Sequence, residues 1–333
     1  KRRILEKKKK QAADTASYLS SVALSQPPAR LQALCAALSA CGASALAPGD
    51  RRGLHPLVVP LGCVSRMEGG NGGEDQRRRR LLASLMPLPS TSAAFAPSNS
   101  SNSKTQEVVI GLLRVPSEQR GLQVVSCTRG APAMELLARS ADELLIRLLA
   151  EEEAFASALS GGGGGERNRP LAAAAGPSAD GLLSASLLAA AAKAAATDGE
   201  SSSSDGEGGE TGKVSTSSLD RALVAAGALS PALCERLLAS HLRKSDEMSA
   251  LITGEWYMRR NHFPGWARPY EHVSKIYASL NRKEEARDCS RVALSLPWWT
   301  LGSGFREAAK LAGLPEDGKG ARAALEAAER GAG

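Results

Sequence analysis

The stretch PYEHVSKIYASLNRKEEARDCSRVALSLP, residues 269–297, carries the clearest folding signal in this sequence. Small side chains stand at Ser274, Ala286 and Ala293, where they let two antiparallel helices approach closely. The two tyrosines in the first half of the stretch are large enough to fill the space beside these small residues. We therefore expect a helical hairpin over residues 269–297.

The aromatic residues point to the same end of the chain. The sequence contains four Trp, four Tyr and four Phe, and nine of these twelve lie between residues 256 and 305. Each aromatic side chain buries on the order of 150–250 Å² in a core. We therefore expect the best-packed part of the protein to be C-terminal.

The spacing within the hairpin resembles one tetratricopeptide repeat over residues 267–299. Four residues match the first helix of the repeat. They are a large residue at Tyr270, an aliphatic residue at Val273, a small residue at Ser274 and a tyrosine at Tyr277. Ala286 and Ala293 follow Tyr277 by nine and sixteen positions, as the small residues of the second helix do in that family. Asn281 stands in place of the usual turn glycine, and asparagine tolerates the left-handed conformation needed there. The resemblance implies a degenerate helical-repeat domain.

A single repeat cannot bury both of its faces, so neighbouring segments must cover it. We expect helices over residues 232–243 and 246–260 upstream and over residues 304–311 downstream. The segments 256–266 and 297–302 are also similar to plant and green-algal plastid proteins of this repeat type. This similarity implies a chloroplast setting. The six scattered cysteines, none in a CxxC pair, otherwise indicate a reducing soluble compartment.

The rest of the chain alternates between segments that can build a core and segments that cannot. We predict a mainly α protein with degenerate tetratricopeptide-like helical hairpins at the C-terminus, a small α+β unit in the middle and long disordered linkers. Within the middle unit, residues 108–113 and 122–125 indicate two strands, whose pairing the sequence leaves open, and residues 131–159 indicate a long helix. The predicted parts are a basic tail (1–10), an N-terminal helical and extended unit (11–66), a disordered linker (67–104), the α+β unit (105–159), a low-complexity linker (160–217), the repeat-like helical domain (218–312) and a C-terminal helix or tail (313–333).

The net charge belongs to one short segment rather than to the whole protein. The formal charge of +7 comes from 42 Lys and Arg against 35 Asp and Glu, and residues 1–10 hold seven basic residues and one acid. Neither this run nor the run 77–80 has interleaved aromatic residues that would stack on bases, which disfavours nucleic acid as a partner. The chain begins with Lys, so we expect an incomplete N-terminus. No sufficiently long apolar run predicts a transmembrane segment in this fragment.

Aromatic and basic residues around the hairpin form our predicted partner-binding surface. Four Trp lie close in sequence to three Arg and one His, and Trp and Arg are enriched at protein interfaces. The arginines favour an acidic segment of a protein partner. The predicted residues are Trp256, Arg259, Arg260, His262, Trp266, Arg268, Trp298 and Trp299.

No catalytic, cofactor or metal pattern is complete. The segment 206–215 resembles a phosphate-binding loop but lacks its first glycine and the Ser or Thr after Lys213. Cys234 and His241 share a helix face but supply only two of the four ligands of a structural zinc site. We therefore predict a non-enzymatic scaffold or assembly factor with no cofactor, which binds a partner through its helical-repeat domain. Two alternatives stay open, RNA binding by helical repeats and an enzyme with its site in the 105–159 unit.

Overall fold

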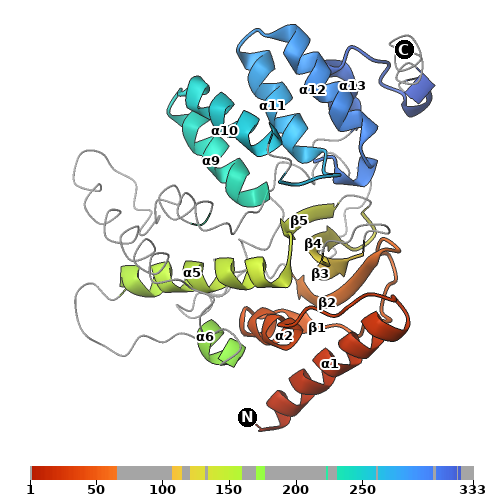
Figure 1. Cartoon of the computed structure of the whole chain (residues 1–333), viewed down its shortest axis with the longest axis vertical. Coiled ribbons are helices and arrows are strands. Elements are labelled where there is room, and N and C mark those ends of the chain that lie inside the picture. Colours follow the sequence, from red (N-terminus) through yellow and green to blue (C-terminus); the bar gives the residue numbers. More distant parts are fainter. Residues whose placement is uncertain are drawn as a thin grey trace, which may run out of the picture. The chain divides into compact units, whose positions relative to one another are not determined.

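A computed structural model gives the fold, and Figure 1 shows its helices and strands. The predicted linker 67–104 and most of the predicted linker 160–217 lie outside the described residues. The structure describes residues 2–65, 107–114, 121–131, 134–159, 170–176, 223, 231–259, 262–302, 305–320 and 322–323.

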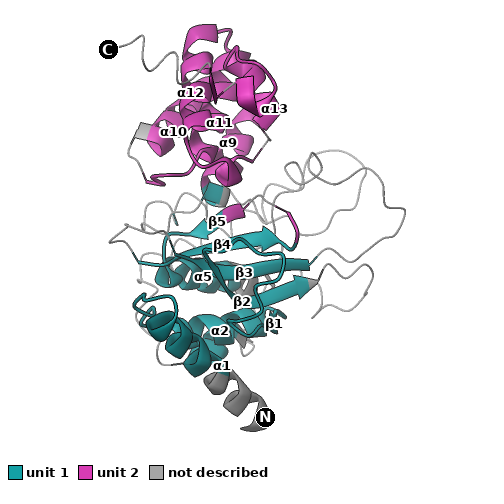
Figure 2. Ribbon diagram, turned by 90° about the vertical axis from the view of Figure 1, so that its right-hand side faces the viewer, with its two compact units in different colours: residues 1–86, 105–129, 136–233 teal, residues 87–104, 130–135, 234–333 magenta. Residues whose placement is uncertain are grey.

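The chain divides into two compact units, coloured separately in Figure 2. Unit 1 comprises residues 1–86, 105–129 and 136–233, and unit 2 comprises the rest, including all residues from 234 onward. Each unit has its own hydrophobic core, and each is described by itself.

Unit 1 is built on a five-stranded sheet with the strand order β1-β2-β3-β4-β5. β1 pairs with β2, β2 with β3 and β3 with β4, each time antiparallel. The two strands predicted in the 105–159 unit therefore pair with each other, and they share a sheet with strands from the 11–66 unit. The strands are β1 (Ser44–Ala45), β2 (Val58–Ser65), β3 (Glu107–Leu113), β4 (Gln123–Thr128) and β5 (Met134–Ala138).

Helices cover one face of this sheet. Alternate residues of β2 and β3, among them Leu61, Ile110 and Leu112, share a core with Leu34 and Leu144 from two of the helices. This alternation is the two-residue period of a strand with one face against a helical layer. Helices α2, α5 and α6 contact one another beside the sheet (Figure 1). The helices of unit 1 are α1 (Arg2–Ser21), α2 (Leu31–Ala40), α5 (Ala141–Leu159) and α6 (Pro170–Ala175).

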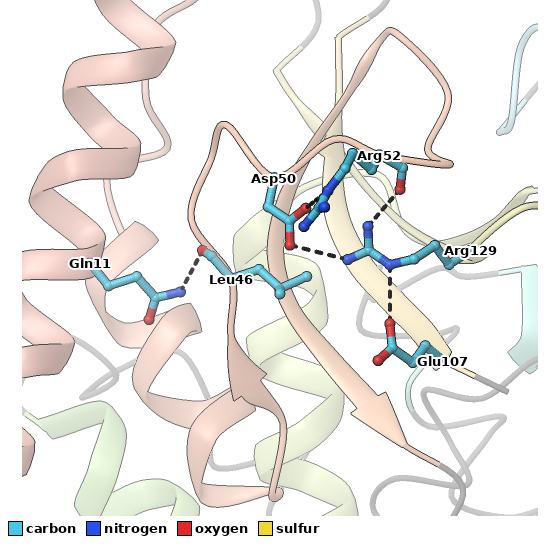
Figure 3. Close-up of polar contacts among 6 residues, drawn as sticks. All are labelled: Gln11, Leu46, Asp50, Arg52, Glu107 and Arg129. Carbon is cyan, nitrogen blue, oxygen red and sulfur yellow. Dashed lines mark hydrogen bonds and ion pairs between the residues drawn. The ribbon is translucent and has the colours of Figure 1, made fainter. Parts of the chain in front are cut away.

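Arg129, which directly follows β4, ties the loop of residues 47–57 to the sheet (Figure 3). Its guanidinium donates to Glu107 Oε2 at 3.1 Å, to the carbonyl oxygen of Arg52 at 2.5 Å and to Asp50 Oδ2 at 3.4 Å. Charge-assisted bonds of this kind are among the stronger hydrogen bonds in proteins. The Arg129 side chain therefore holds the loop of residues 47–57 against the sheet, next to the start of β3 and the end of β4.

The long helix predicted over residues 131–159 is wrong in its first part. Met134–Ala138 forms β5, and α5 begins only at Ala141. Ser140 Oγ accepts a hydrogen bond from the backbone N–H of Glu143 at 3.2 Å, and the Glu143 carboxylate accepts one from the backbone N–H of the residue before Ser140 at 3.0 Å. The S-x-x-E spacing is a known sequence signal for the start of a helix. The prediction overlooked this signal.

Two segments that were predicted as a tail and as a linker contain helix. The basic tail 1–10 lies almost entirely within α1, and the predicted linker 160–217 contains α6. The buried carboxylate of Glu152 accepts hydrogen bonds from the backbone N–H groups of Leu171 at 2.8 Å and Ala172 at 3.0 Å. A carboxylate at the first turn satisfies otherwise unpaired N–H groups and complements the helix dipole, which explains this short helix.

From residue 234 onward, the regular structure of the described residues of unit 2 is helical. α10, α11, α12 and α13 each contact the next helix in the series. The helices are α9 (Pro231–Arg243), α10 (Glu247–Arg259), α11 (Arg268–Ser279), α12 (Lys283–Ser295), the short 3₁₀ helix η2 (Trp298–Thr300) and α13 (Phe305–Leu311). The described helices of the protein include none that is long and apolar enough to span a membrane.

The helical hairpin predicted over residues 269–297 is confirmed as α11 and α12. Asn281 lies in the turn between them with a φ of 59°, the left-handed conformation expected of it. Ala286 and Ala293 are buried, Ala286 in one core cluster with Tyr277 and Ala293 in the next cluster along the hairpin. Small residues on α12 thus allow the close helix approach that the sequence predicted.

Candidate partner-binding surface

A buried ion pair fastens α11 to α9. The guanidinium of Arg268 donates to both carboxylate oxygens of Glu235, at 2.8 Å for the Nη2 to Oε2 bond, and His272 Nε2 lies 3.2 Å from Glu235 Oε1. Burial by itself raises the pKa of Glu235, but the charges of Arg268 and His272 outweigh it and lower the pKa to about 2. The carboxylate is therefore ionised at neutral pH, and the two helices are held in a fixed relation.

The same cluster fixes the position of η2. The backbone N–H of Gly302 donates to Glu271 Oε2 at 2.7 Å, and the backbone N–H of Ala267 donates to Thr300 Oγ1 at 3.0 Å. The position of Gly302 has no room for a side chain, since a Cβ there would lie 2.5 Å from Nη1 of Arg268. These contacts seat η2 against the N-terminal end of α11.

Trp298 is the first residue of η2, which the contacts described above hold in place. Its side chain is 56% exposed, and its ring centroid lies 6.1 Å from that of Trp299 in an edge-on arrangement with an interplanar angle of 79°. A large exposed aromatic side chain on a fixed backbone is typical of the anchor residues that dominate binding energy at protein interfaces.

A second aromatic pair lies at the end of α10. The ring centroids of Trp256 and His262 are 4.7 Å apart at an interplanar angle of 46°, and both side chains are partly exposed. This tilted ring contact reduces the freedom of the Trp256 ring, so less entropy is lost when a partner contacts it.

The structure removes two of the predicted residues from the surface. Trp266 is 3% exposed and Arg268 is 5% exposed, so both serve the core of unit 2. The side chain of Arg259 and the whole of Arg260 lie outside the described residues. The predicted surface therefore narrows to the two aromatic pairs, Trp256 with His262 and Trp298 with Trp299.

Sequence reasoning missed two exposed side chains on α10. Met248 is 61% exposed and Ile252 is 65% exposed. Together with Trp256 they occupy positions i, i+4 and i+8, which lie along one side of a helix. We call these three residues the α10 ridge. The sequence held the signal, because α10 has apolar residues on this side as well as on its core side, where an ordinary amphipathic helix would be polar.

Ion pairs neutralise many of the basic residues of unit 2. Arg268 pairs with Glu235, Arg282 Nη2 lies 2.6 Å from Glu285 Oε1, and Arg287 Nη1 lies 2.8 Å from Glu284 Oε2. These three arginines are therefore neutralised within the chain. Recognition of an acidic segment of the partner stays a prediction.

The described residues contain no group of three or more His, Cys, Asp or Glu that is arranged to hold a metal ion. The six cysteines are free thiols, and four of them are buried. Burial raises the pKa of the Cys35 and Cys127 thiols to about 11 and that of Cys41 to about 12. These thiols are protonated at neutral pH and serve as apolar core residues.

Comparisons with known proteins agree with the division of the chain. A family model described as the PAB middle domain matches residues 231–315, and one described as PAB N-terminal matches residues 13–70. The Arabidopsis thaliana protein named Protein IN CHLOROPLAST ATPASE BIOGENESIS, chloroplastic, is 27% identical over 303 residues, which cover 89% of this chain and 67% of that protein. No solved structure matches the chain. The first match begins at α9 and ends just beyond α13, and so contains the α10 ridge and both aromatic pairs.

Proposed function

We propose that this protein is a non-enzymatic assembly factor of the chloroplast, and that it holds a subunit of the plastid ATPase before that subunit joins its complex. The similar Arabidopsis protein is named for chloroplast ATPase biogenesis and aligns with most of this chain. Similarity to the PAB models in both units supports a shared architecture. A chloroplast location for this protein follows from the same relationship.

The exposed apolar side chains of unit 2 carry this proposal. Met248, Ile252 and Trp298 are each more than half exposed, on a unit whose core is closed by buried aliphatic and aromatic residues. Large apolar side chains left exposed on a folded unit are candidate sites of protein contact. A subunit awaiting assembly exposes the apolar surface that its neighbours will later cover, so such a site complements it.

We also propose that α11 and α12 form a degenerate tetratricopeptide-like hairpin, with α9 and α10 as its upstream neighbours. Support comes from the left-handed Asn281 in the turn and from the buried small residues on α12. Tyr277 reinforces the hairpin, because its hydroxyl donates to Glu255 Oε1 of α10 at 2.5 Å and the Arg282 guanidinium lies 4.7 Å from its ring centroid. Stacked helical hairpins present extended binding surfaces, as the proposed function requires.

Affinity purification of the tagged full chain from chloroplasts tests the proposal. We expect mass spectrometry to show one or more plastid ATPase subunits enriched with the wild-type chain. Trp298→Ala should lower that enrichment at least threefold, because it removes the exposed indole that we assign to the contact. Val292→Ala, which truncates another exposed side chain in unit 2, is the matched control and should retain the partner. Absence of every ATPase subunit from the wild-type sample would refute the proposed function.

A further inference from the structure

The helix α10 is apolar on two opposite sides. Its inner side places Ala250, Leu251 and Tyr257 in buried positions, whereas the α10 ridge of Met248, Ile252 and Trp256 lies on the other side. A surface helix normally has one apolar side, which faces the core, and a polar side opposite. The ridge is an apolar side in the place where a polar side is expected.

Close packing prevents α10 from rotating to hide the ridge. A Cβ at Gly254 would lie 3.0 Å from Val273 Cγ2, 3.6 Å from Ile276 Cδ1 and 3.7 Å from Leu238 Cδ2. Glycine costs about 1 kcal/mol relative to alanine inside a helix, and here it allows α11 and α9 to approach the inner side of α10. With its inner side fixed in this way, α10 keeps the ridge facing outward.

We infer that the α10 ridge is the docking site for an amphipathic helix of the partner. This inference rests on the proposed function and specifies how the ATPase subunit is recognised. α9 and α11 both pack on the inner side of α10, where Leu238 and Val273 share a core cluster with Ala250 and Leu251. In stacked helical proteins a face that no further helix covers is polar. The outer side of α10 carries the exposed side chains of Met248 and Ile252 instead, so a helix from outside the chain completes the packing around α10.

The geometry of the ridge favours a helix over an extended segment. Residues spaced by four form a continuous ridge that fits into the groove between side chains of a second helix. At 1.5 Å per residue the ridge is about 12 Å long, which corresponds to a little over two helical turns of an occupant. An extended segment would gain no backbone hydrogen bonds here, since the backbone groups within a helix are already paired.

Charge at the start of α10 sets the direction of the occupant. The helix begins at Glu247, whose side chain is exposed. An antiparallel occupant places its own last turn beside this acidic start. Helices favour basic residues in the last turn. The ridge therefore selects an antiparallel amphipathic helix with a basic end.

Peptide binding to the full chain tests this inference. The probes are fluorescent 20-residue peptides that tile the subunits of the plastid ATPase, with scrambled peptides of equal composition as controls. We expect the tightest peptides to have apolar residues at helical spacing and a basic last turn, and to gain helical circular dichroism when bound. Ile252→Glu should weaken their binding at least tenfold, and Val292→Glu, at an exposed aliphatic position on α12, should leave it unchanged.

A charge exchange checks the direction. Glu247→Lys should weaken the same peptides severalfold, and replacing the last-turn basic residue of the peptide by Glu should restore binding to that variant. Equal peptide binding by Ile252→Glu and the wild type would overturn the inference, as would a tightest peptide without helical periodicity. Loss of a concentration-dependent dimer in Ile252→Glu, seen by light scattering, would show that a second copy covers the ridge and would also overturn it.

The outcome for the ridge is separable from the outcome for the proposed function. If intact ATPase subunits co-purify equally well with the wild type and with Ile252→Glu, the assembly role stands and the ridge inference falls. If no ATPase subunit co-purifies with the wild type, and none of the peptides binds, both fall. Because Ile252 is exposed, Ile252→Glu should keep the wild-type thermal midpoint, which shows that any lost binding is local.

Discussion

At the scale of single residues, the buried pair of Glu235 and Arg268 links stability to pH. The pKa of Glu235 falls from its ordinary value of 4.5 to about 2 in the folded chain, although burial alone would raise it. A carboxylate with a lowered pKa stabilises the fold fully above its unfolded pKa, and this stabilisation disappears as pH falls toward the folded value. We therefore expect the wild type to lose on the order of 3 kcal/mol through this group between about pH 4.5 and pH 2.

Glu235→Gln should remove this dependence. At pH 7 the variant deprives the buried guanidinium of Arg268 of its nearest carboxylate but leaves it the Glu135 carboxylate, whose Oε1 lies 3.0 Å from Nη1, so we expect a cost of about 1–3 kcal/mol. The difference from the wild type should shrink as pH falls toward 2, and urea unfolding at several pH values measures it. Glu284→Gln, at an exposed ion pair with Arg287, is the control and should leave the curve nearly unchanged. A constant difference at every pH would show that Glu235 does not titrate as described.

Local composition carries only part of the information about single residues. Trp298 was one of four tryptophans named as candidates for the surface, and its side chain is exposed, while its part in partner binding stays a prediction. Arg268 was assigned to the same surface and is buried, because its partner Glu235 lies 33 positions away on another helix. Composition near a residue does not reveal such a distant partner. Met248 and Ile252 were overlooked because apolar residues in a helix were expected to face the core.

At the scale of elements, the turn between α11 and α12 depends on a left-handed residue. Asn281 has a φ of 59°, which asparagine and glycine tolerate and β-branched residues do not. Asn281→Gly should change the free energy of unfolding by less than about 1 kcal/mol. Asn281→Val should lower it by about 1–2 kcal/mol, because the branched side chain clashes in that conformation.

Urea unfolding followed by tryptophan fluorescence measures both Asn281 variants, since all four tryptophans lie in the unit that contains this turn. Ala278→Val, at an exposed position inside α11, is the control for valine itself and should cost only about 0.5 kcal/mol. Equal costs at positions 278 and 281 would show that backbone conformation does not limit the turn.

Element boundaries were predicted correctly only where the residues that begin or end a helix were recognised. The hairpin of α11 and α12 was predicted because small residues and a turn residue recur at fixed spacing. The strand β5 was missed because Met134, Leu136 and Leu137 suit a helix by composition. Ser140 and Glu143, which mark the true start of α5, were the physical signal that separates the strand from the helix.

At the scale of the whole molecule, pairing between strands that are distant in the sequence forms the sheet of unit 1, and the sequence did not predict this pairing. Segments 44–65 and 107–138 were predicted as parts of separate units, yet they share one sheet. Strand propensity identifies single strands, but pairing between distant segments leaves no mark in local composition. The sequence does contain two residues that mark this pairing. Gly111 on β3 lies opposite Pro60 on β2, beside an irregularity in the register of the two strands.

Gly111 allows β3 to lie close to β2 because it has no side chain. A Cβ there would lie 2.6 Å from Val58 Cγ1 and 2.8 Å from the carbonyl oxygen of Val59, and the backbone oxygen cannot move without breaking the ladder. Gly111→Ala should therefore destabilise unit 1 by about 1–3 kcal/mol. Gly121→Ala, at a site with no atom within 4 Å of the added Cβ, is the matched control and should have little effect.

Two probes separate the effect of Gly111→Ala on the two units. Unit 1 contains no tryptophan, so intrinsic fluorescence follows unit 2, while hydrogen exchange of the β3 and β4 amides follows the sheet. Because each unit closes its own core, the variant should lose protection in the sheet and keep the fluorescence midpoint of the wild type. A parallel drop in both would mean that the cores fold as one cooperative body. Loss of stability in the sheet would then also lower partner binding at the α10 ridge.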